Sequence, residues 1–294
     1  MTTRGPAPAD GRPFPWLLPA IAFTALFYLV PVIDVVRLAF SDATLVRGAS
    51  GYSLDAFRAV LGDPALPQVL GTTFVFTAVN VIALQVAGLA IALLIVRGEA
   101  RGLRGMAAFR TLVLAAWVVP GIANGLIWQM LFDEAPYGTL NSILGGVGLG
   151  PVAWLSDPQM ALVSAVIANL WQGTAFSMIV FYAARRGIDP TLYEVAQLDG
   201  ARAWRSFRSI TLPLLRTAIA VNTVLVTVQT LNTFDSILAL TGGGPGRATE
   251  VLALFTFNTV FYNFDLAGGS VLAVLLFTIS AALAALVHGW LGRT

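Results

Sequence analysis

The feature that most constrains this chain is a series of apolar segments, each long enough to cross a lipid bilayer. A transmembrane helix needs about 20 predominantly apolar residues. Six segments reach that length, at residues 16–40, 68–96, 109–132, 160–184, 214–240 and 268–290. Only 11% of the residues are charged, against about 25% in soluble domains. The sequence therefore predicts an all-α, polytopic membrane protein with about six transmembrane helices.

The remaining segments predict one domain with a short tail. Residues 1–15 form a polar N-terminal tail, and residues 16–294 form the transmembrane domain. The first apolar segment is too long for a signal peptide and lacks a small-residue cleavage pattern, so we expect a retained helix. The apolar stretch at 251–264 is short, which favours a re-entrant or interfacial helix.

Arginine placement predicts the orientation of the chain in the membrane. All 17 basic residues are arginine, and loops rich in basic residues face the cytoplasm. With a cytoplasmic N-terminus, the outer side holds only Arg37, Arg47, Arg58 and Arg247. This bias predicts that both termini, and the polar segment at 189–213, lie in the cytoplasm.

Composition also excludes several function classes. Without lysine the chain cannot carry a P-loop ATPase site, and without cysteine it has no thiolate metal site or cysteine nucleophile. The predicted spans contain almost no acidic residues beyond Asp34, beside Arg37, and Asp235. This disfavours an ion-coupled secondary transporter, although sodium sites built from carbonyls and hydroxyls stay possible. No catalytic constellation or metal site is visible, which speaks against an intramembrane enzyme.

The polar segment 189–213 has its own pattern. Asp189 and Pro190 favour a helix start, so a short helix is expected at about 191–198. Gly200 favours a left-handed helix end, and a second helix is expected from Ala201 toward Leu215. An apolar stripe runs along this second helix through Trp204, Phe207, Ile210 and Leu214. One interpretation is an amphipathic helix anchored on anionic lipid. The other is a docking segment, because small residues among the acids permit close packing by a partner.

The same segment resembles the EAA motif of binding-protein-dependent ABC importer permeases. The matching positions are Glu194, Ala196, Asp199, Gly200, Ala201, Phe207, Ile210, Leu212 and Pro213, and the sequence departs at Val195, where alanine is usual. The resemblance implies that the short helix before the glycine docks on a separate ATPase subunit and transmits its closure. It implies that Glu194, Ala196, Asp199, Gly200 and Ala201 carry this coupling.

A second stretch narrows the resemblance to carbohydrate-uptake permeases of the MalF type. "LTGGGPGRATEVL" resembles their motif after the fifth span, and Gly242, Gly243, Gly244 and Pro245 require a tight outer loop. The stretches at 17–42 and 52–74 also resemble this type, apart from Gly71, where asparagine is usual. The large extra outer domain of the maltose protein is missing.

The resemblance implies a type I importer permease with the MetI-like fold, in a bacterial inner membrane. Its implied partners are two ATP-binding subunits, a second MalG-like permease, an extracytoplasmic sugar-binding protein and membrane lipid, with no nucleic acid. ATP and Mg would bind the partner ATPases, so no cofactor is expected on this chain. The solute is expected to be a di- or oligosaccharide, with glycerol-3-phosphate or another small polar solute as the alternative.

Polar side chains inside the predicted spans are candidates for the substrate path. These candidates are Asn222, Gln229, Asn232, Asp235, Ser236, Asn169, Gln172, Asn124 and Trp128. Those in the fifth span fall on one side of a single long helix, with Asp235 at its edge, which makes this the best candidate surface. The alternative for each residue is a hydrogen bond that holds two helices together.

Overall fold

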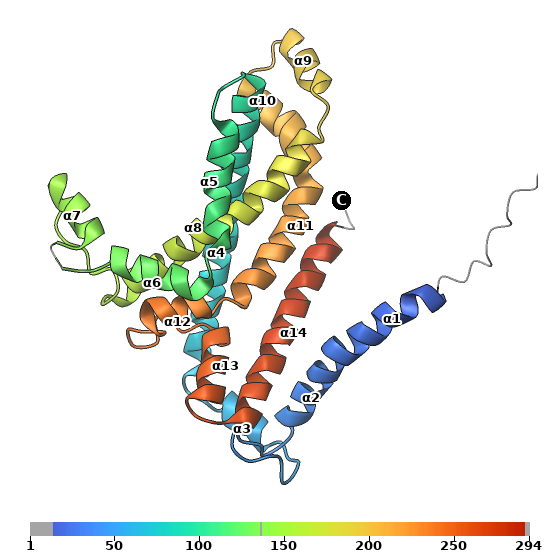
Figure 1. Ribbon diagram of the computed structural model, residues 1–294, viewed down its shortest axis with the longest axis vertical. Coiled ribbons are helices and arrows are strands. Elements are labelled where there is room, and N and C mark those ends of the chain that lie inside the picture. Colours follow the sequence, from blue (N-terminus) through green and yellow to red (C-terminus); the bar gives the residue numbers. More distant parts are fainter. Residues whose placement is uncertain (1–13, 136, 292–294) are drawn as a thin grey trace, which may run out of the picture.

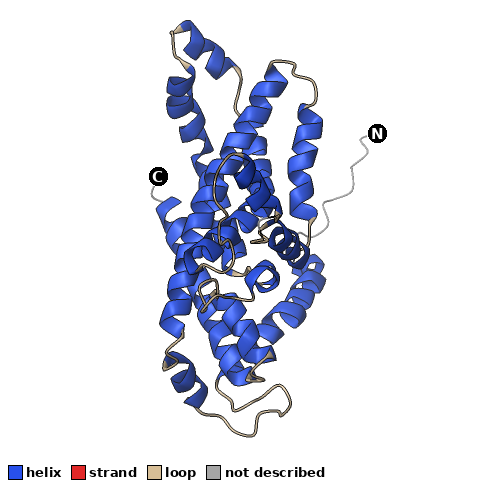
Figure 2. Ribbon diagram, turned by 90° about the vertical axis from the view of Figure 1, so that its left-hand side faces the viewer, coloured by secondary structure: helices blue, strands red, loops and turns tan. Residues whose placement is uncertain are grey.

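The fold is a bundle of long helices with short helices at both ends (Figure 1). A computed structural model describes residues 14–135 and 137–291, so nearly all of the predicted tail lies outside the described residues. Within these ranges there is no strand, only one isolated bridge between Ser41 and Tyr52 (Figure 2). The helices are α1 (Phe14–Thr24), α2 (Val30–Ala39), α3 (Asp55–Leu61), α4 (Leu66–Ala100), α5 (Met106–Val118), α6 (Gly121–Leu131), α7 (Thr139–Gly146), α8 (Pro158–Arg186), α9 (Thr191–Leu198), α10 (Ala203–Ser206), α11 (Leu212–Leu231), α12 (Asp235–Thr241), α13 (Leu252–Phe261) and α14 (Leu266–Leu291), with the π-helical turns η1 (Ala25–Leu29) and η2 (Phe207–Thr211).

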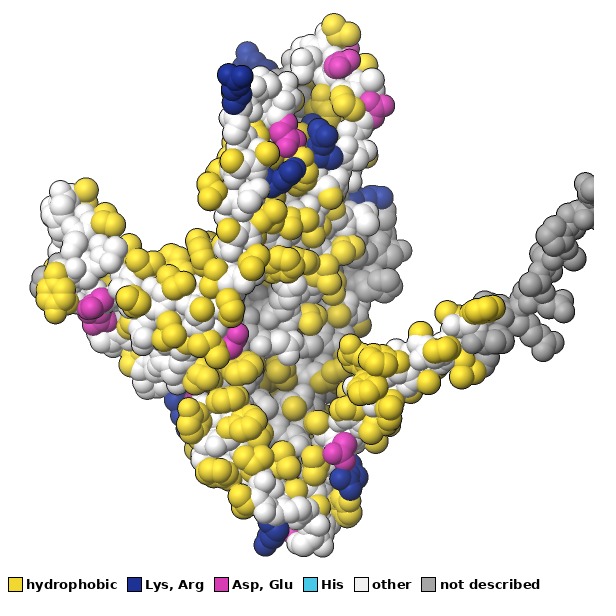
Figure 3. Space-filling view, viewed as in Figure 1, with side chains coloured by type: hydrophobic (Ala, Val, Ile, Leu, Met, Phe, Trp, Pro, Cys, Tyr) yellow, Lys and Arg dark blue, Asp and Glu magenta, His cyan; other side chains and the backbone are white. Residues whose placement is uncertain are grey.

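The predicted number of membrane spans is confirmed. Five described helices or helix runs are long and apolar enough to cross a bilayer, and the number is six when the bent pair α5–α6 is counted as one span. The short apolar helix expected at 251–264 is α13. Many large apolar side chains along the sides of the bundle are exposed, as expected where lipid or another subunit covers them (Figure 3).

The third predicted span is broken into two helices. α5 and α6 meet at an angle of 103°, and Pro120 caps α6 while Val119 is extended, with ψ at 125°. Proline disfavours a helical conformation in the residue before it, which accounts for the break at this position. The prediction of one continuous helix over 109–132 is therefore wrong.

The fifth predicted span is also broken. α11 ends at Leu231, and Asn232 caps it, so that Asp235 and Ser236 lie on the separate helix α12. The prediction of one polar stripe on a continuous helix from 214 to 240 is therefore wrong. α6 and α12, which follow the two breaks, pack against each other (Figure 1).

The centre of the bundle is the packing of α4 against α8. Asn169 on α8 donates a 2.9 Å hydrogen bond to Asn80 on α4, and both side chains are buried. Two turns further along α4, Gly88 faces Ser177 so closely that a Cβ there would lie 2.4 Å from the Ser177 Cβ. The contact surface thus combines a buried amide pair with small residues, the usual means of close approach between membrane helices.

Replacing Gly88 with valine should destabilise the bundle by about 1–3 kcal/mol, the usual cost of overpacking. The new side chain would press on the backbone of Ser177 and Met178, where a Cβ would already lie 2.9 Å from two backbone atoms. Thermal unfolding of the detergent-solubilised protein measures the effect. Gly71→Val is the matched control on the same helix, because nothing lies within 4 Å of a Cβ at Gly71. Equal melting temperatures for the two variants would contradict this view of the α4–α8 contact.

Candidate functional site

The coupling segment begins with a short helix whose two ends are closed by local hydrogen bonds. Asp189 accepts a 2.9 Å hydrogen bond from the backbone N–H of Thr191 at the start of α9. At the other end, Gly200 has φ of +73°, and the N–H of Ala201 donates to the carbonyl of Ala196 at 2.8 Å. This is a Schellman termination, which needs a residue free to adopt the left-handed conformation. The predicted helix at 191–198 and the predicted role of Gly200 as its end are confirmed.

The start of α9 should respond to acid. Hydrogen bonds from the backbone and the hydroxyl of Thr191 lower the pKa of Asp189. A lowered folded-state pKa means that this stabilisation is present above about pH 4, the usual value for aspartate, and is lost as pH falls through the lower folded-state value. A nitroxide on Leu192→Cys, the only cysteine in such a chain, should stay equally mobile down to about pH 4 and become more mobile below it.

The control is the same label in an Asp189→Asn background. Asparagine keeps a side-chain acceptor but does not titrate, so label mobility should no longer change with acid. An identical acid response in both backgrounds would show that Asp189 does not hold the start of α9.

α9 has an inner side that attaches it to the bundle and an outer side that is uncovered. On the inner side, the hydroxyls of Tyr193 and Thr211 are 2.9 Å apart, and the Arg185 guanidinium lies 4.1 Å from the centre of the Tyr193 ring. On the outer side, Val195 is 58% exposed and Leu198 89% exposed. No residue of α9 is buried. A helix at the end of the molecule that leaves apolar side chains uncovered has the character of a docking surface.

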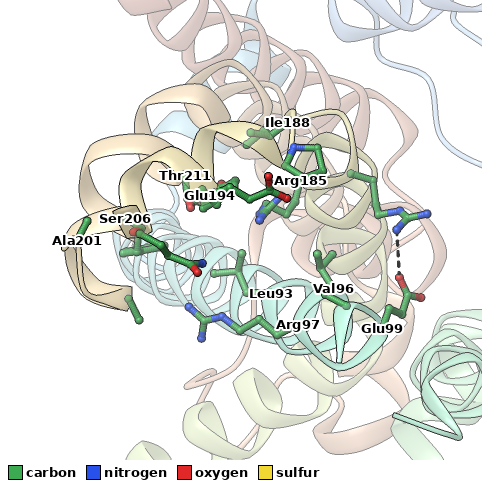
Figure 4. A pocket seen from close by; sticks show the side chains of 17 residues that line it. Leu93, Val96, Arg97, Glu99, Arg185, Ile188, Glu194, Ala201, Ser206 and Thr211 are labelled. Carbon is green, nitrogen blue, oxygen red and sulfur yellow. Dashed lines mark hydrogen bonds and ion pairs between the residues drawn. The ribbon is translucent and has the colours of Figure 1, made fainter. Parts of the chain in front are cut away.

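A cavity of about 620 Å³ lies between α9 and the end of the bundle (Figure 4). Among the coupling residues, Glu194 and Ala201 line it, together with Arg185 and Thr211. Glu194 and Asp199 are exposed, while Ala196 is half-buried on the inner side. The structure thus brings Glu194 and Ala201 to one cavity, whereas Ala196, Asp199 and Gly200 do not line it.

Beside this cavity, one carboxylate joins the ends of three long helices. Glu99 of α4 accepts a 3.0 Å hydrogen bond from Tyr182 of α8, and Tyr182 accepts one of 2.9 Å from Arg110 of α5. Arg110 and Arg186 also lie 3.7 Å and 3.9 Å from Glu99 carboxylate oxygens. Neither Glu99 nor Tyr182 was among the residues predicted from the sequence. The only signal was an acid among arginines at a predicted helix end.

Within the bundle, four predicted substrate-path residues take part in hydrogen bonds between helices. Asn222 donates to Gln85 at 2.9 Å and to Ser177 at 3.0 Å. Asn124 donates to the Ala168 carbonyl at 3.2 Å, and Gln172 donates to the Val119 carbonyl at the α5–α6 break. The fourth, Asn169, forms the pair with Asn80 described above. In this arrangement they hold helices together, and their contact with a solute stays a prediction.

The other candidates are placed differently. Gln229 and Asn232 are exposed, Asp235 and Trp128 are half-buried, and Ser236 is buried. Asn232 lines a second cavity of about 630 Å³ between α11, α13 and α14. The stacked rings of Phe234 and Phe257, whose centres are 5.2 Å apart, also line this cavity. An amide beside aromatic rings is an arrangement that suits a sugar.

Asp235 lies where the two broken helices meet. Its carboxylate packs on the first residue of α6, so closely that a Cβ on Gly121 would lie 2.0 Å from Oδ2. The positive end of the α6 dipole favours a negative charge there. Within the described residues Asp235 has no ion pair, and its carboxylate accepts one hydrogen bond, from the backbone N–H of Ser236 at 2.9 Å.

The outer loop after α12 is tightly built, as expected for its glycines. Gly242 and Gly243 have φ of +62° and +91°, and the Gly244–Pro245 peptide is cis. The Thr249 hydroxyl donates to the Gly244 carbonyl at 2.8 Å, and Gln68 of α4 donates to the Gly246 carbonyl at 3.1 Å. The loop is therefore fixed to the start of the second span.

Comparison with known proteins gives one family and several long matches. Residues 100–294 match the family described as "Binding-protein-dependent transport system inner membrane component". The chain is 34% identical over 265 residues to the trehalose/maltose transport system permease protein MalF of Thermococcus litoralis, covering 90% of this chain and 88% of that one. It is 33% identical over 281 residues to the sn-glycerol-3-phosphate transport system permease protein UgpA of Brucella abortus, covering 93% and 92%.

Among solved structures, a bacterial ABC transporter involved in the import of the acidic polysaccharide alginate is similar over 95% of this chain and 94% of the matched chain. The TM-score is 0.82 and the sequence identity is 21%. At this identity the likeness establishes the fold, which is that of an ABC importer permease.

Proposed function

The chain belongs to the family of binding-protein-dependent transport system inner membrane components, and from that premise we propose that it imports a di- or oligosaccharide. It is a multi-pass membrane protein and the permease subunit of an ABC importer, a transport component and not an enzyme. The proposal of a sugar rests on one observation, the 34% identity over 90% of the chain to a trehalose/maltose permease.

In the proposed assembly the chain pairs with a second permease, two ATPase subunits and an external sugar-binding protein. ATP and Mg bind the ATPases, and this chain binds no cofactor. α9 and the adjoining Gly200 dock on one ATPase and pass its closure to the bundle, which opens the substrate path toward the binding protein. The uncovered apolar side chains of α9, with the exposed Glu194 and Asp199, support this role. In this orientation both termini are cytoplasmic.

The second candidate solute is glycerol-3-phosphate, which the UgpA match favours. Phosphate groups are usually held by arginine. The described arginines on the spans lie near helix ends and not at the two helix breaks. The charged residue at those breaks is the acid Asp235. A carboxylate in the path repels a phosphate monoester and accepts hydrogen bonds from sugar hydroxyls, so we favour the neutral sugar.

Uptake measurements test this proposal. Cells that lack the gene for this chain and cells that express it are given labelled trehalose, maltose or glycerol-3-phosphate. We expect chain-dependent, orthovanadate-sensitive uptake of a sugar. Chain-dependent uptake of glycerol-3-phosphate alone would select the second candidate, and uptake that resists vanadate would favour an ion-coupled carrier.

A further inference from the structure

Three hollows meet at one arginine near the end of α4. The first is the cavity beneath α9. The second, about 400 Å³, lies between the end of α4 and the start of α5, and the third, about 450 Å³, lies between α4 and α10. Arg97 lines all three, and Arg101, one turn further on, lines the second. One cationic residue is therefore shared by three hollows.

Arg97 and Arg101 differ from Arg110 and Arg186 in having no acidic partner among the described residues. The nearby carboxylate, Glu99, is already shared by Arg110 and Arg186. Figure 4 shows Arg97 and Glu99 pointing to opposite sides of α4. Among the described residues no ion pair involves Arg97 or Arg101. Two unpaired positive charges thus stand one helical turn apart.

The walls of the second and third hollows are mainly apolar and open to the outside. Leu94 is 59% exposed and Trp204 is 70% exposed, on the two sides of the third hollow. Phe109 and Leu103 form part of the second, and both are exposed. Apolar grooves beside unpaired cations are matched to a ligand that has an anionic head and apolar chains.

The position along α4 also fits the surface of a bilayer. α4 has 35 residues, which is about 50 Å of helix, whereas the hydrocarbon core of a bilayer is about 30 Å thick. The last turns of α4, which carry Arg97 and Arg101, therefore extend into the headgroup region. Tryptophan is enriched at the headgroup level of membrane proteins. Trp204, which lines the third hollow together with Arg97, fits this position.

We propose that the hollows around Arg97 bind one anionic phospholipid. Its phosphate pairs with Arg97 and Arg101, and its acyl chains lie in the apolar hollows on the two sides of α4. Because Arg97 also lines the cavity beneath α9, the bound lipid lies next to the coupling segment. This inference goes beyond the proposed function and is independent of the solute that the chain imports.

Native mass spectrometry of the intact protein, purified in detergent with added phosphatidylglycerol or phosphatidylcholine, tests the site. Removing one arginine near a membrane surface should cost about a fivefold loss of lipid affinity. We therefore expect the double variant Arg97→Gln/Arg101→Gln to retain about 25-fold less phosphatidylglycerol. The matched control is Arg202→Gln/Arg208→Gln, which removes two exposed arginines of the same region that line none of the three hollows. It should change retention much less, because neither arginine lines a hollow in which the lipid is proposed to bind.

Further measurements distinguish a specific lipid site from three alternatives: unspecific lipid around the bundle, binding of a soluble anion, and an effect of net charge. The charge-preserving variant Arg97→Lys/Arg101→Lys should keep most of the bound lipid, even where the glutamine variant folds poorly. Equal retention of phosphatidylcholine and phosphatidylglycerol would reduce the site to an ordinary lipid belt and overturn the proposal. Displacement of the lipid by inorganic phosphate alone would assign the arginines to a soluble anion, and equal losses in the control variant would assign the effect to net charge.

Discussion

Solute uptake should fall about 100-fold or more when Glu194 is replaced by lysine, while the protein still inserts in the membrane. Glu194 is exposed on α9, the helix that leaves its apolar side chains uncovered at the end of the molecule. If α9 docks on an ATPase subunit, a reversed charge at that contact costs several kcal/mol, and each 1.4 kcal/mol is about tenfold in affinity. The measurement is uptake in cells, with copurification of the ATPase subunit as the readout of docking.

The control must separate docking from local damage, because Glu194 also lines the cavity that Arg185 and Arg97 share. Glu194→Gln removes the charge without placing a new cation there, so we expect a smaller loss of uptake and an unchanged melting temperature. If Glu194→Lys lowers the melting temperature and the ATPase still copurifies, the residue acts inside the chain. Normal uptake by Glu194→Lys would contradict the docking role altogether.

The coupling segment was predictable from the sequence because its structure is local. A helix of 8 residues with a capping aspartate before it and a glycine after it specifies its own ends, since each bond joins residues a few positions apart. The predicted bounds, 191–198, match α9 for this reason. Local sequence patterns do not predict the cavity behind α9, because it forms only when α4, α8 and α10 pack beside that helix.

The two broken spans show where local reasoning fails. Pro120 gave a sequence signal for the first break, because proline disfavours a helical conformation in the residue before it, Val119. Proline alone, however, does not predict whether a helix kinks slightly or turns by 103°, as it does here. At Asn232 the chain contains neither proline nor glycine, and the break coincides with the packing of α12 on α6. That packing depends on Gly125, where a Cβ would lie 2.4 Å from the Ser236 carbonyl oxygen.

The buried amides show a related limit. The sequence places Asn222, Asn169 and Asn124 on polar helix faces, a pattern equally typical of a substrate path and of contacts between helices. The structure pairs them with Gln85, Asn80 and Gln172 on other helices. Those pairs join residues between 48 and 137 positions apart, so no local pattern identifies the partner. The oxygens of Asn124 and Asn222, and the indole N–H of Trp128, still lack a partner among the described residues.

Replacing Asp235 with alanine should lower uptake about 10- to 100-fold through a higher KM, with the melting temperature changed little. The half-buried carboxylate lies at the two helix breaks and accepts only one hydrogen bond within the described chain. A sugar hydroxyl bonded to a charged group contributes about 1.5–3 kcal/mol, which gives the expected factor. Uptake rates over a range of solute concentrations, at equal amounts of transporter, provide KM and the maximal rate separately.

The competing role for Asp235 is structural, because its carboxylate also packs on the first residue of α6. Asp235→Asn distinguishes the two roles, since asparagine keeps the shape and one acceptor oxygen. A residue that binds solute should give an intermediate KM with asparagine and a high KM with alanine, at equal melting temperatures. A residue that only stabilises α6 should instead give a lower melting temperature with alanine and an unchanged KM in every variant that folds. That second pattern would remove Asp235 from the substrate path. The exposed polar candidates would then be Gln229 of α11 and Asn232, which caps that helix.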